Sequence, residues 1–418
     1  MSNLATYRLG DIATFVNGRA YSMPEMLLDG KYRIVRVGNF TGKDEWYYSD
    51  MELDAEKYCE SGDLLYKWAC TFGPEIWTKE KAIYHYHIWK VVPNGKYIDK
   101  VYLYYLLGFM TSKWMKAAHG STMVHITKEI MENNIVMIPS DINEQRLVVE
   151  QLKKIDAKID NNNAICADLE GMAKLLYDYW FVQFDFPDEN GKPYKSSGGK
   201  MVWNEELKRE IPEGWSVVRL GDYITADRGI SYNSTTLEGN GVPMINLASF
   251  NVDSTYKASG LKTYSGAYGE DQVLHPYDLV MCNTQQTAID PAKDIIGKTL
   301  LVPDIFDGDI VSSHHVTTIH VADYAFKYYL HAESKTTWFH KYVAGFASGT
   351  NILGLDFNGV LNYKMPIPPK EIMSKFANIS HSFEARKNEV IRENADLAGL
   401  RDFLLPMLMN GQVNVKGA

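Results

Sequence analysis

An internal repeat constrains the fold of this chain more than any other feature. Arg8-Leu9-Gly10-Asp11 returns as Arg219-Leu220-Gly221-Asp222, and at the same offset Gly18 and Tyr21 return as Gly229 and Tyr232. Near the end of each half, Ile138-Pro139 matches Ile367-Pro368. A period of about half the chain is too long for one unit of a stacked-repeat protein. The sequence therefore predicts two related domains built on one scaffold.

The composition is that of an ordinary globular protein. Of the 418 residues, 23% are charged and 45% are hydrophobic, values typical of folded domains. The four cysteines form no Cys-x-x-Cys pair, so neither a disulfide framework nor a zinc site is predicted. The start of the chain has no basic segment followed by an apolar one, and no long apolar run occurs. We therefore expect a cytoplasmic protein that does not span a membrane.

The net charge of −9 does not by itself favour binding to nucleic acid. Neutralising phosphates requires clustered Lys and Arg side chains. However, the acidic residues could concentrate in the helices while other faces stay neutral or basic, and a partner protein could supply the phosphate contacts. Net charge therefore leaves a nucleic-acid role open.

Two long helices with matching apolar seams are predicted, one after each Ile-Pro pair. Their seam positions alternate in steps of three and four residues, which is heptad spacing. The positions are Val148, Leu152, Ile155, Ile159, Asn162, Cys166, Leu169, Ala173, Leu176 and Trp180, and then Phe376, Ile379, Phe383, Arg386, Val390, Glu393, Leu397, Leu400, Leu404 and Met407. Because the seams occupy equivalent places in the two halves, we expect them to pack against each other rather than each on its own domain.

The helix pair is expected to be antiparallel. A duplicated unit associates most simply about a pseudo-twofold axis, and such an axis perpendicular to the helices would place the globular repeats at opposite ends of a rod. Asn162, Arg386 and Glu393 interrupt the apolar seams. They are interpreted either as buried polar residues that set the register or as solvent-facing positions on a bent helix.

Each repeat is predicted to be an α+β domain. The expected strands are Ile34–Val37, Ile83–Val92, Met244–Leu247 and His315–Val321, and the expected helices are Lys100–Phe109 and Tyr324–Phe339. The segment 185–200 is rich in Gly, Pro, Ser and charge and is predicted to be a linker or turn-rich connection. The predicted division is residues 1–140 for the first domain, 141–186 for the central helix, 187–369 for the connection and second domain, and 370–418 for the C-terminal helix.

Several segments in this order resemble the specificity subunits of type I restriction-modification systems. Besides Arg-Leu-Gly-Asp at the start of each half, they are Ile138–Gln145, Tyr179–Phe186, Lys200–Trp215 and Leu404–Gly411. The resemblance covers nearly the whole chain. The second half departs from the pattern where Asn143-Glu144-Gln145 becomes Ile372-Met373-Ser374, so the start of the second helix is less well defined.

The resemblance implies a non-catalytic subunit with two target recognition domains and conserved helices that dock two methyltransferase subunits. Those partners would methylate adenine with S-adenosylmethionine, and restriction subunits would use ATP and Mg²⁺ to translocate and cut DNA. This chain would hold no cofactor itself. Its ligand would be double-stranded DNA with a bipartite, asymmetric target, whose half-sites lie about one helical turn apart, roughly 34–36 Å or a multiple of it.

Three loops in each half carry side chains suited to reading base edges. Asn and Gln can bond adenine, Arg and Lys can bond guanine, and Ser, Thr and His make adaptable contacts. The candidate DNA-contacting residues are Arg19, Tyr21, Lys67, Trp68, Thr71, Ser121 and Thr122 in the first half, and Arg228, Tyr232, Asn233, Asn283, Thr284, Gln285, Gln286, Thr287, Thr350 and Asn351 in the second. The alternative for any one of them is a solvated turn that satisfies the backbone.

Motifs for catalysis are weak. Gly297-Lys298-Thr299 looks like the end of a P-loop, but Ala292 stands where the phosphate-binding loop needs glycine. The chain has no Asn-Pro-Pro-aromatic motif and no Gly-rich turn for S-adenosylmethionine. His314-His315 could be metal ligands, but no second pair lies nearby, so hydrogen bonding or DNA contact is preferred.

Two other functions and one other site stay open at this point. The chain could be a nuclease or methyltransferase with unrecognised motifs, or a helical scaffold that binds protein and not DNA. The aromatic cluster of Trp180, Phe181, Phe184 and Phe186 could stack on bases. Its place at the end of a heptad seam favours core packing or a methyltransferase docking patch instead.

Overall fold

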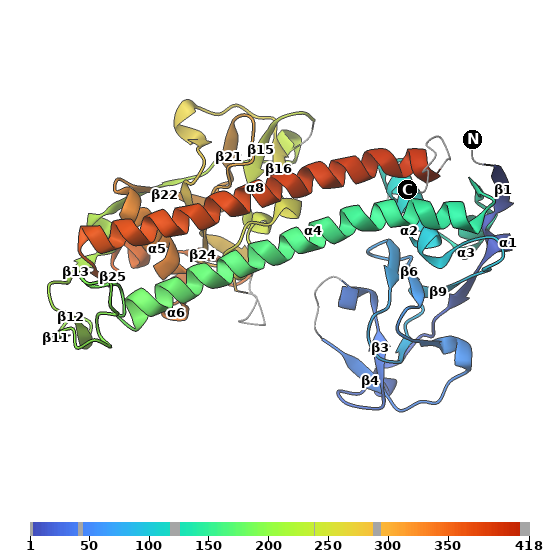
Figure 1. The fold of residues 1–418 in the computed structure, drawn as a ribbon, viewed down its shortest axis with the longest axis horizontal. Helices are drawn as coiled ribbons and strands as arrows, with labels where there is room; N and C mark the ends of the chain where they lie inside the picture. The colour runs from blue at the N-terminus through green and yellow to red at the C-terminus, as the bar shows by residue number, and fades with distance from the viewer. Residues whose placement is uncertain (1–2, 41–44, 118–125, 238, 287–293, 410–418) are drawn as a thin grey trace. The chain divides into compact units, whose positions relative to one another are not determined.

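The structure is a computed structural model that describes residues 3–40, 45–117, 126–237, 239–286 and 294–409 (Figure 1). The chain forms two compact units. Unit 1 comprises residues 1–160 together with 395–418, and unit 2 comprises residues 161–394. Both units contain helices and sheets, which confirms the predicted α+β class.

Unit 1 contains two four-stranded sheets and one separate strand pair. The sheet orders are β2-β9-β6-β7 and β4-β3-β8-β5, and β1 pairs with β10. The second sheet has a parallel pair at its centre, β3 with β8. The strands are β1 (Leu4–Arg8), β2 (Ala13–Asn17), β3 (Tyr32–Val35), β4 (Tyr47–Ser49), β5 (Tyr58–Cys59), β6 (Leu64–Lys67), β7 (Gly73–Ile76), β8 (Ala82–Tyr84), β9 (Ile88–Pro93) and β10 (Ile135–Pro139).

Unit 2 repeats this plan strand for strand. Its sheets are β14-β22-β18-β20 and β16-β15-β21-β17, the latter again with a central parallel pair, and β13 pairs with β25. Unit 2 also has the hairpin β11-β12 and the sheet β19-β24-β23. The strands are β11 (Met201–Asn204), β12 (Arg209–Pro212), β13 (Ser216–Arg219), β14 (Ile224–Arg228), β15 (Val242–Ile245), β16 (Lys262–Tyr264), β17 (Val273–Leu274), β18 (Leu279–Cys282), β19 (Thr284–Gln286), β20 (Thr299–Leu301), β21 (Ile310–Ser312), β22 (Val316–Val321), β23 (Ala347–Ser348), β24 (Ile352–Leu355) and β25 (Lys364–Ile367).

Two predicted elements are each divided in the structure. The expected strand 83–92 is broken by a turn at His85–His87, where the Ile88 N–H donates to the His85 carbonyl at 2.9 Å. The expected helix 324–339 is two helices, because the Thr336 side chain caps a new one by accepting from the Phe339 N–H at 3.3 Å. The shorter helices are α1 (Leu9–Ile12), α2 (Lys100–Ala117), α3 (Lys128–Asn133), α5 (Tyr324–Ser334), α6 (Thr337–Ala344) and α7 (Phe357–Leu361).

The two predicted long helices are present as α4 (Ile142–Tyr177) and α8 (Lys370–Met409). Gln145 explains why an Asn-Glu-Gln segment begins α4. This fully buried amide accepts from the Asp99 N–H at 2.8 Å and donates to the carbonyls of Tyr97 and Pro139 at 2.9 and 2.8 Å. One side chain therefore fixes the start of the helix to two neighbouring loops.

The helices pair in antiparallel fashion, as predicted. In unit 2, Asn162 of α4 donates to the Glu393 carboxylate of α8 at 2.9 Å, while Lys387 donates to Glu170 at 2.7 Å. The partner number falls along α8 as the number rises along α4. Asn162 is completely buried, so it and Glu393 are polar seam residues.

The second predicted seam is wrong at Leu400, which is 46% exposed, and at Arg386. Arg386 is not a seam residue, because its side chain is 55% exposed and pairs with Glu389 on the same helix. The adjacent Lys387 faces α4 instead. The heptad count did not locate this position, because a buried ammonium group was not expected among apolar side chains.

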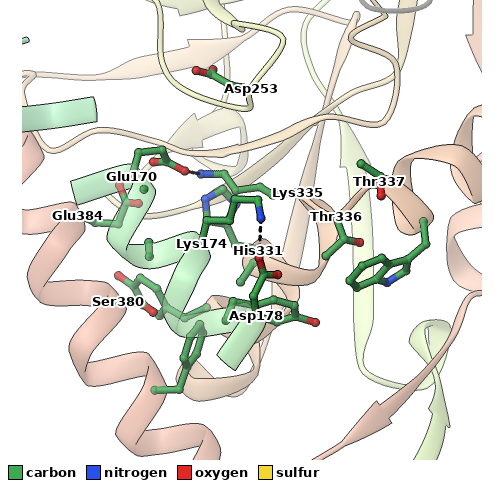
Figure 2. Close-up of a pocket in the computed structure, with 17 residues that line it drawn as sticks. Glu170, Lys174, Asp178, Asp253, His331, Lys335, Thr336, Thr337, Ser380 and Glu384 are labelled. Carbon is green, nitrogen blue, oxygen red and sulfur yellow. Dashed lines mark hydrogen bonds and ion pairs between the residues drawn. The ribbon is translucent and has the colours of Figure 1, made fainter. Parts of the chain in front are cut away.

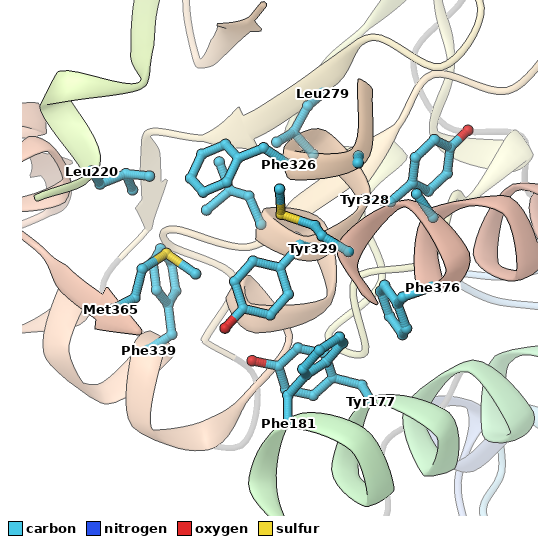
Figure 3. Packing of buried hydrophobic residues seen from close by; sticks show 14 of the residues in the cluster. Tyr177, Phe181, Leu220, Leu279, Phe326, Tyr328, Tyr329, Phe339, Met365 and Phe376 are labelled. Carbon is cyan, nitrogen blue, oxygen red and sulfur yellow. The ribbon is translucent and has the colours of Figure 1, made fainter. Parts of the chain in front are cut away.

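Each unit takes part of its core from a long helix of the other sequence half. In unit 1, the end of α8 supplies the buried residues Leu408 and Met409, and the Tyr102 hydroxyl donates to the Met409 carbonyl at 3.2 Å. In unit 2, Tyr177 at the end of α4 and Phe181 in the helical turn that follows it pack on Tyr329 and Phe376 (Figure 3). The aromatic cluster at 180–186 is thus part of the core of unit 2, as the sequence favoured.

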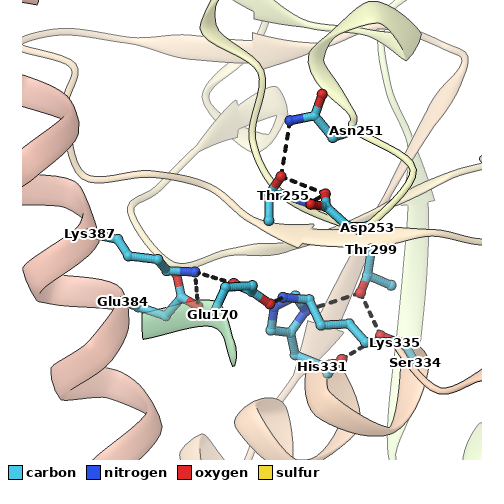
Figure 4. A network of polar contacts seen from close by, with 10 residues as sticks. All are labelled: Glu170, Asn251, Asp253, Thr255, Thr299, His331, Ser334, Lys335, Glu384 and Lys387. Carbon is cyan, nitrogen blue, oxygen red and sulfur yellow. Dashed lines mark hydrogen bonds and ion pairs between the residues drawn. The ribbon is translucent and has the colours of Figure 1, made fainter. Parts of the chain in front are cut away.

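A buried charge cluster joins α4, α5 and α8 in unit 2 (Figure 4). The Glu170 carboxylate binds the ammonium groups of Lys335 and Lys387, and Lys387 also binds Glu384 at 2.7 Å. Burial alone would raise the pKa of Glu170, but Lys335 and Lys387 outweigh burial and lower it to about 2. Partial burial makes each ion pair stronger than it would be at the surface.

Replacing Glu170 by Gln should destabilise unit 2 by about 3 kcal/mol, because the substitution leaves buried ammonium groups without this carboxylate. The measurement is urea denaturation of the full chain near neutral pH. E205Q is the matched control, since the Lys208–Glu205 pair is 72% and 78% exposed. It should cost less than about 0.5 kcal/mol.

The pH dependence gives a second check on the same cluster. The pKa of Glu170 is lower in the folded state than its ordinary value of 4.5. The stability advantage of the wild type over E170Q should therefore be complete above that ordinary value and decline as the pH falls toward about 2. An advantage that stays constant across this range would contradict an ionic origin.

Candidate nucleic-acid interface

Two of the predicted loops in unit 1 meet at the turn His85–His87. The Tyr86 N–H donates to the Arg19 carbonyl at 3.0 Å, and the Trp68 N–H donates to the His87 carbonyl at 3.2 Å. The Trp68 indole N–H also donates to the Tyr86 carbonyl at 2.8 Å. We call residues His85–His87 the unit 1 turn.

Unit 2 has the same arrangement at Ser313–His315, which we call the unit 2 turn. The His314 N–H donates to the Ile230 carbonyl at 2.8 Å, and the Asn283 N–H donates to the His315 carbonyl at 3.0 Å. The Asn283 side-chain amide donates to the His314 carbonyl at 3.3 Å. Asn283 therefore occupies the position of Trp68, and His314 occupies that of Tyr86.

In unit 2, the predicted loop that carries Thr350 and Asn351 lies beside the one that carries Asn283. Strand β19 pairs with β24, with Gln286 opposite Ile352. Thr350 and Asn351 form the exposed connection between β23 and β24. The structure therefore brings the 283–286 segment next to the 350–351 loop. Ser121, Thr122 and Thr287 lie outside the described residues.

The polar side chains after β18 are buried and serve the fold of the loop. Asn283, Thr284 and Gln285 are only 5%, 6% and 5% exposed. The side-chain amide oxygen of Gln285, Oε1, accepts from the backbone N–H groups of Ile295 and Ile296 at 2.7 and 3.1 Å. The Thr284 hydroxyl bonds the His315 ring at 2.7 Å. These groups hold the unit 2 turn and its neighbours in place and do not reach the surface.

The other candidates divide into buried and exposed groups. Lys67 is buried and paired with Glu75 at 2.7 Å, and Tyr21 is buried under the unit 1 turn. Arg19 is half-buried and paired with Glu25 at 2.6 Å. The half-buried candidates also include Trp68 and Tyr232, and the exposed candidates are Thr71, Arg228, Asn233, Thr350 and Asn351.

Histidines at both turns are neutral at ordinary pH. Burial, His87 and Arg36 lower the pKa of His85 to about 4. Burial and the neighbouring cations Arg228 and Lys262 also lower the pKa of His315, with His314 contributing. A neutral imidazole offers one donor and one acceptor. These rings are therefore suited to hydrogen bonding and not to neutralising phosphate.

Three cations beside the turns have no carboxylate partner among the described residues. Arg36 stacks on Tyr47, with its guanidinium carbon 4.3 Å from the ring centroid. Arg228 donates to the His314 carbonyl at 2.9 Å, and Lys262 donates to the Tyr232 hydroxyl at 3.1 Å. These three side chains are therefore available to an acidic ligand at the turns.

A separate cavity of about 330 Å³ lies in unit 2, between α4, α5 and α8 (Figure 2). Aromatic rings, among them Tyr328 and Trp338, form much of its wall. Its charged groups are paired with one another, as in the contacts Glu170–Lys335 and Lys174–Asp178. The cavity therefore lies beside the charge cluster, and none of the residues that line it belongs to either turn.

The described part of the chain contains no group of three side chains placed to bind a metal ion. His315, which the sequence offered as a ligand, is bonded to Thr284 instead. None of the helices in the described ranges has the length and apolar composition needed to cross a bilayer.

Asn283→Ala should destabilise unit 2 by about 1–2 kcal/mol, because it removes amide bonds to the Thr317 hydroxyl at 2.8 Å and to the His314 carbonyl. Urea denaturation of the full chain measures this loss. Asn351→Ala is the matched control, because Asn351 is exposed, and it should cost less than about 0.5 kcal/mol. Equal costs at the two positions would contradict a structural role for Asn283.

Known proteins resemble the chain in sequence and in fold. Residues 1–171 match the family model for the type I restriction modification DNA specificity domain. The chain is 24% identical over 332 residues to the MjaIX specificity subunit of Methanocaldococcus jannaschii, covering 78% of this chain and 72% of that protein. It is 22% identical over 418 residues to the MjaVIII specificity subunit of the same organism, covering 98% and 92%.

The fold comparison agrees with the sequence comparison. A crystal structure of the S subunit of a type I restriction-modification system from M. genitalium aligns with a TM-score of 0.50 at 12% identity, covering 100% of this chain and 97% of that one. The likeness of fold spans both units, whereas the family model covers the first half. The resemblance to the specificity subunits of type I restriction-modification systems, predicted from the sequence, is thus confirmed by the family model over residues 1–171 and by the curated relatives.

Proposed function

We propose that each unit of this specificity subunit reads one half of a bipartite target in double-stranded DNA. The observation that carries the proposal is a shared backbone frame with different side chains at equivalent places. Trp68 corresponds to Asn283, and Tyr86 corresponds to His314. A scaffold that keeps its strand order while the middle residue of the turn changes from Tyr86 to His314 is suited to reading two different base sequences. The subunit itself is non-catalytic.

The charges near the turns support contact with DNA. Arg36 in unit 1 and Arg228 and Lys262 in unit 2 have no carboxylate partner among the described residues. Side chains of this kind bond both phosphates and guanine edges. With DNA as the ligand, the protein would act in the cytoplasm.

Exposed apolar side chains near the ends of the long helices support docking of two methyltransferase subunits. On α4 of unit 2, Met172 and Leu175 are 51% and 68% exposed, and Tyr179, in the helical turn 178–182 that follows α4, is 40% exposed. On α8 of unit 1, Leu400 and Phe403 are 46% and 61% exposed. The members of each set lie three or four residues apart, which is the spacing of one helix face, and exposed apolar patches mark interaction sites. S-adenosylmethionine, ATP and Mg²⁺ would belong to the partner methyltransferase and restriction subunits.

Grafting residues 1–139 from a relative of different specificity should change only one half of the target. The other half should keep its bases, because unit 2 has its own sheets and its own turn. The measurement is methylation of a DNA library by the assembled complex. A reciprocal graft of the second globular repeat is the control and should change the other half. A graft that alters both halves would contradict the two-module proposal.

Leu175→Glu should remove one of two docked methyltransferase subunits, and Phe403→Glu should remove the other. Burying an unpaired carboxylate in an apolar contact costs more binding free energy than the apolar patch contributes to docking. The mass of the intact complex measures the outcome. Leu28→Glu, at a position 87% exposed in unit 1, is the control and should leave both partners bound. Retention of two methyltransferase subunits by the L175E F403E double variant would exclude these patches as the docking sites.

A further inference from the structure

We propose that the unit 1 turn and the unit 2 turn are the main base-reading elements of the two units, with Tyr86 and His314 at their tips. The inference rests on the proposed DNA-reading function and assigns it to particular residues. The sequence alone favoured the polar run after β18, of which the structure buries Asn283, Thr284 and Gln285. Three independent observations point to the turns instead.

The first observation is that the repeated residues of the two halves hold the turns. A Cβ atom on Gly18 would lie 2.3 Å from the His85 carbonyl oxygen, and one on Gly229 would lie 2.4 Å from that of Ser313. Such approaches are closer than any real side chain makes, so only glycine fits at either place. The parallel bridges Arg19–His85 and Ile230–Ser313 tie the same segments together. The invariant part of the repeat is therefore a support for the turn.

The second observation is the chemistry displayed on that support. Tyr86 and His87 have ring centroids 3.9 Å apart, and His314 and His315 have centroids 3.8 Å apart. Tyr86 is 40% exposed. Each turn thus presents a close pair of rings with hydrogen-bonding edges, and the tip residue differs between the units. Different tips on equal supports are what two different half-sites require.

The third observation is an excess of unsatisfied polar atoms around the turns. Ten buried side-chain atoms of the described residues have no hydrogen-bond partner, and half of them belong to Tyr21, Arg36, Asn283, Ser313 and His314. Buried polar atoms are nearly always paired in native proteins. Their concentration at two equivalent turns indicates groups that gain partners when a ligand binds, either directly or through bridging water.

The cations already described complete each reading site. Arg36 contributes to the lowered pKa of His85, and Arg228 and Lys262 contribute to that of His315. Each ring pair therefore has near it at least one cation with no carboxylate partner among the described residues. Arg is the side chain that most often bonds guanine through N7 and O6. The ligand of each site is accordingly the edge of one or two base pairs.

The test uses the assembled complex and a library of methylation targets. Tyr86→Ala should relax one or two adjacent positions in the first half-site, and His314→Ala should do so in the second. Discrimination at those positions should fall roughly tenfold or more, with the opposite half unchanged. His320→Ala is the control, because this histidine on β22 is 49% exposed, pairs with Asp227, and lies away from the turn. It should leave the target unchanged.

Reciprocal variants guard against misfolding. Tyr86→His and His314→Tyr place in each turn the ring that the equivalent turn already carries, so both backbones accommodate them. Each should change the preferred bases in its own half. Unchanged selectivity in all four turn variants, with a defined bipartite target still methylated, would overturn the inference alone. A uniform loss of binding with a smaller salt slope would also overturn it, because that indicates phosphate contact. A wild-type complex without sequence preference would overturn the proposed function itself.

Discussion

The exchange of helix ends between the two sequence halves is the constraint on which the rest of the structure depends. The core of unit 1 includes Leu408 and Met409 from the end of α8, and the core of unit 2 includes Tyr177 from the end of α4 and Phe181 from the turn that follows it. Neither half of the sequence supplies a complete core by itself. Burial of large aromatic and aliphatic side chains contributes about 1.5–3 kcal/mol each. Burial of these side chains therefore favours folding of the two sequence halves together, with α4 and α8 paired.

The long helices and the repeated units could be predicted from the sequence because both follow from local residue patterns. Heptad spacing located α4 and α8, and the repeated Arg-Leu-Gly-Asp segments located the equivalent starts of the two units. Such patterns do not show which of Arg386 and Lys387 faces α4. Lys387 enters the interface because Glu170 and Glu384 are there to bind it, and long-range charge pairing leaves no periodic signal in one sequence.

The candidate site was predicted only in outline. The loops that hold Trp68 and Asn283 do meet other predicted loops, and they meet at turns. In unit 1 the turn interrupts the strand predicted over Ile83–Val92. In unit 2 the turn lies at the start of the strand predicted over His315–Val321. Composition favoured Asn283 and Gln285 because amides are good base readers, whereas burial at 5% shows them bonding backbone groups of their own loop. A signal was present in the repeated Gly18 and Gly229. A glycine retained in two diverged copies indicates a close backbone approach, and its partner in each copy is the turn.

The separation of selectivity from charge explains how an acidic chain can take part in DNA recognition. Contacts to phosphates supply most of the affinity and carry no sequence information, while contacts to base edges supply the discrimination. In the proposed function, the rings at the turns provide the second kind of contact, together with the few cations beside them that have no carboxylate partner among the described residues. The net charge of −9 leaves little of the first. Partner subunits docked on the exposed ends of α4 and α8 would then provide phosphate contacts, so that sequence reading and tight binding both depend on assembly.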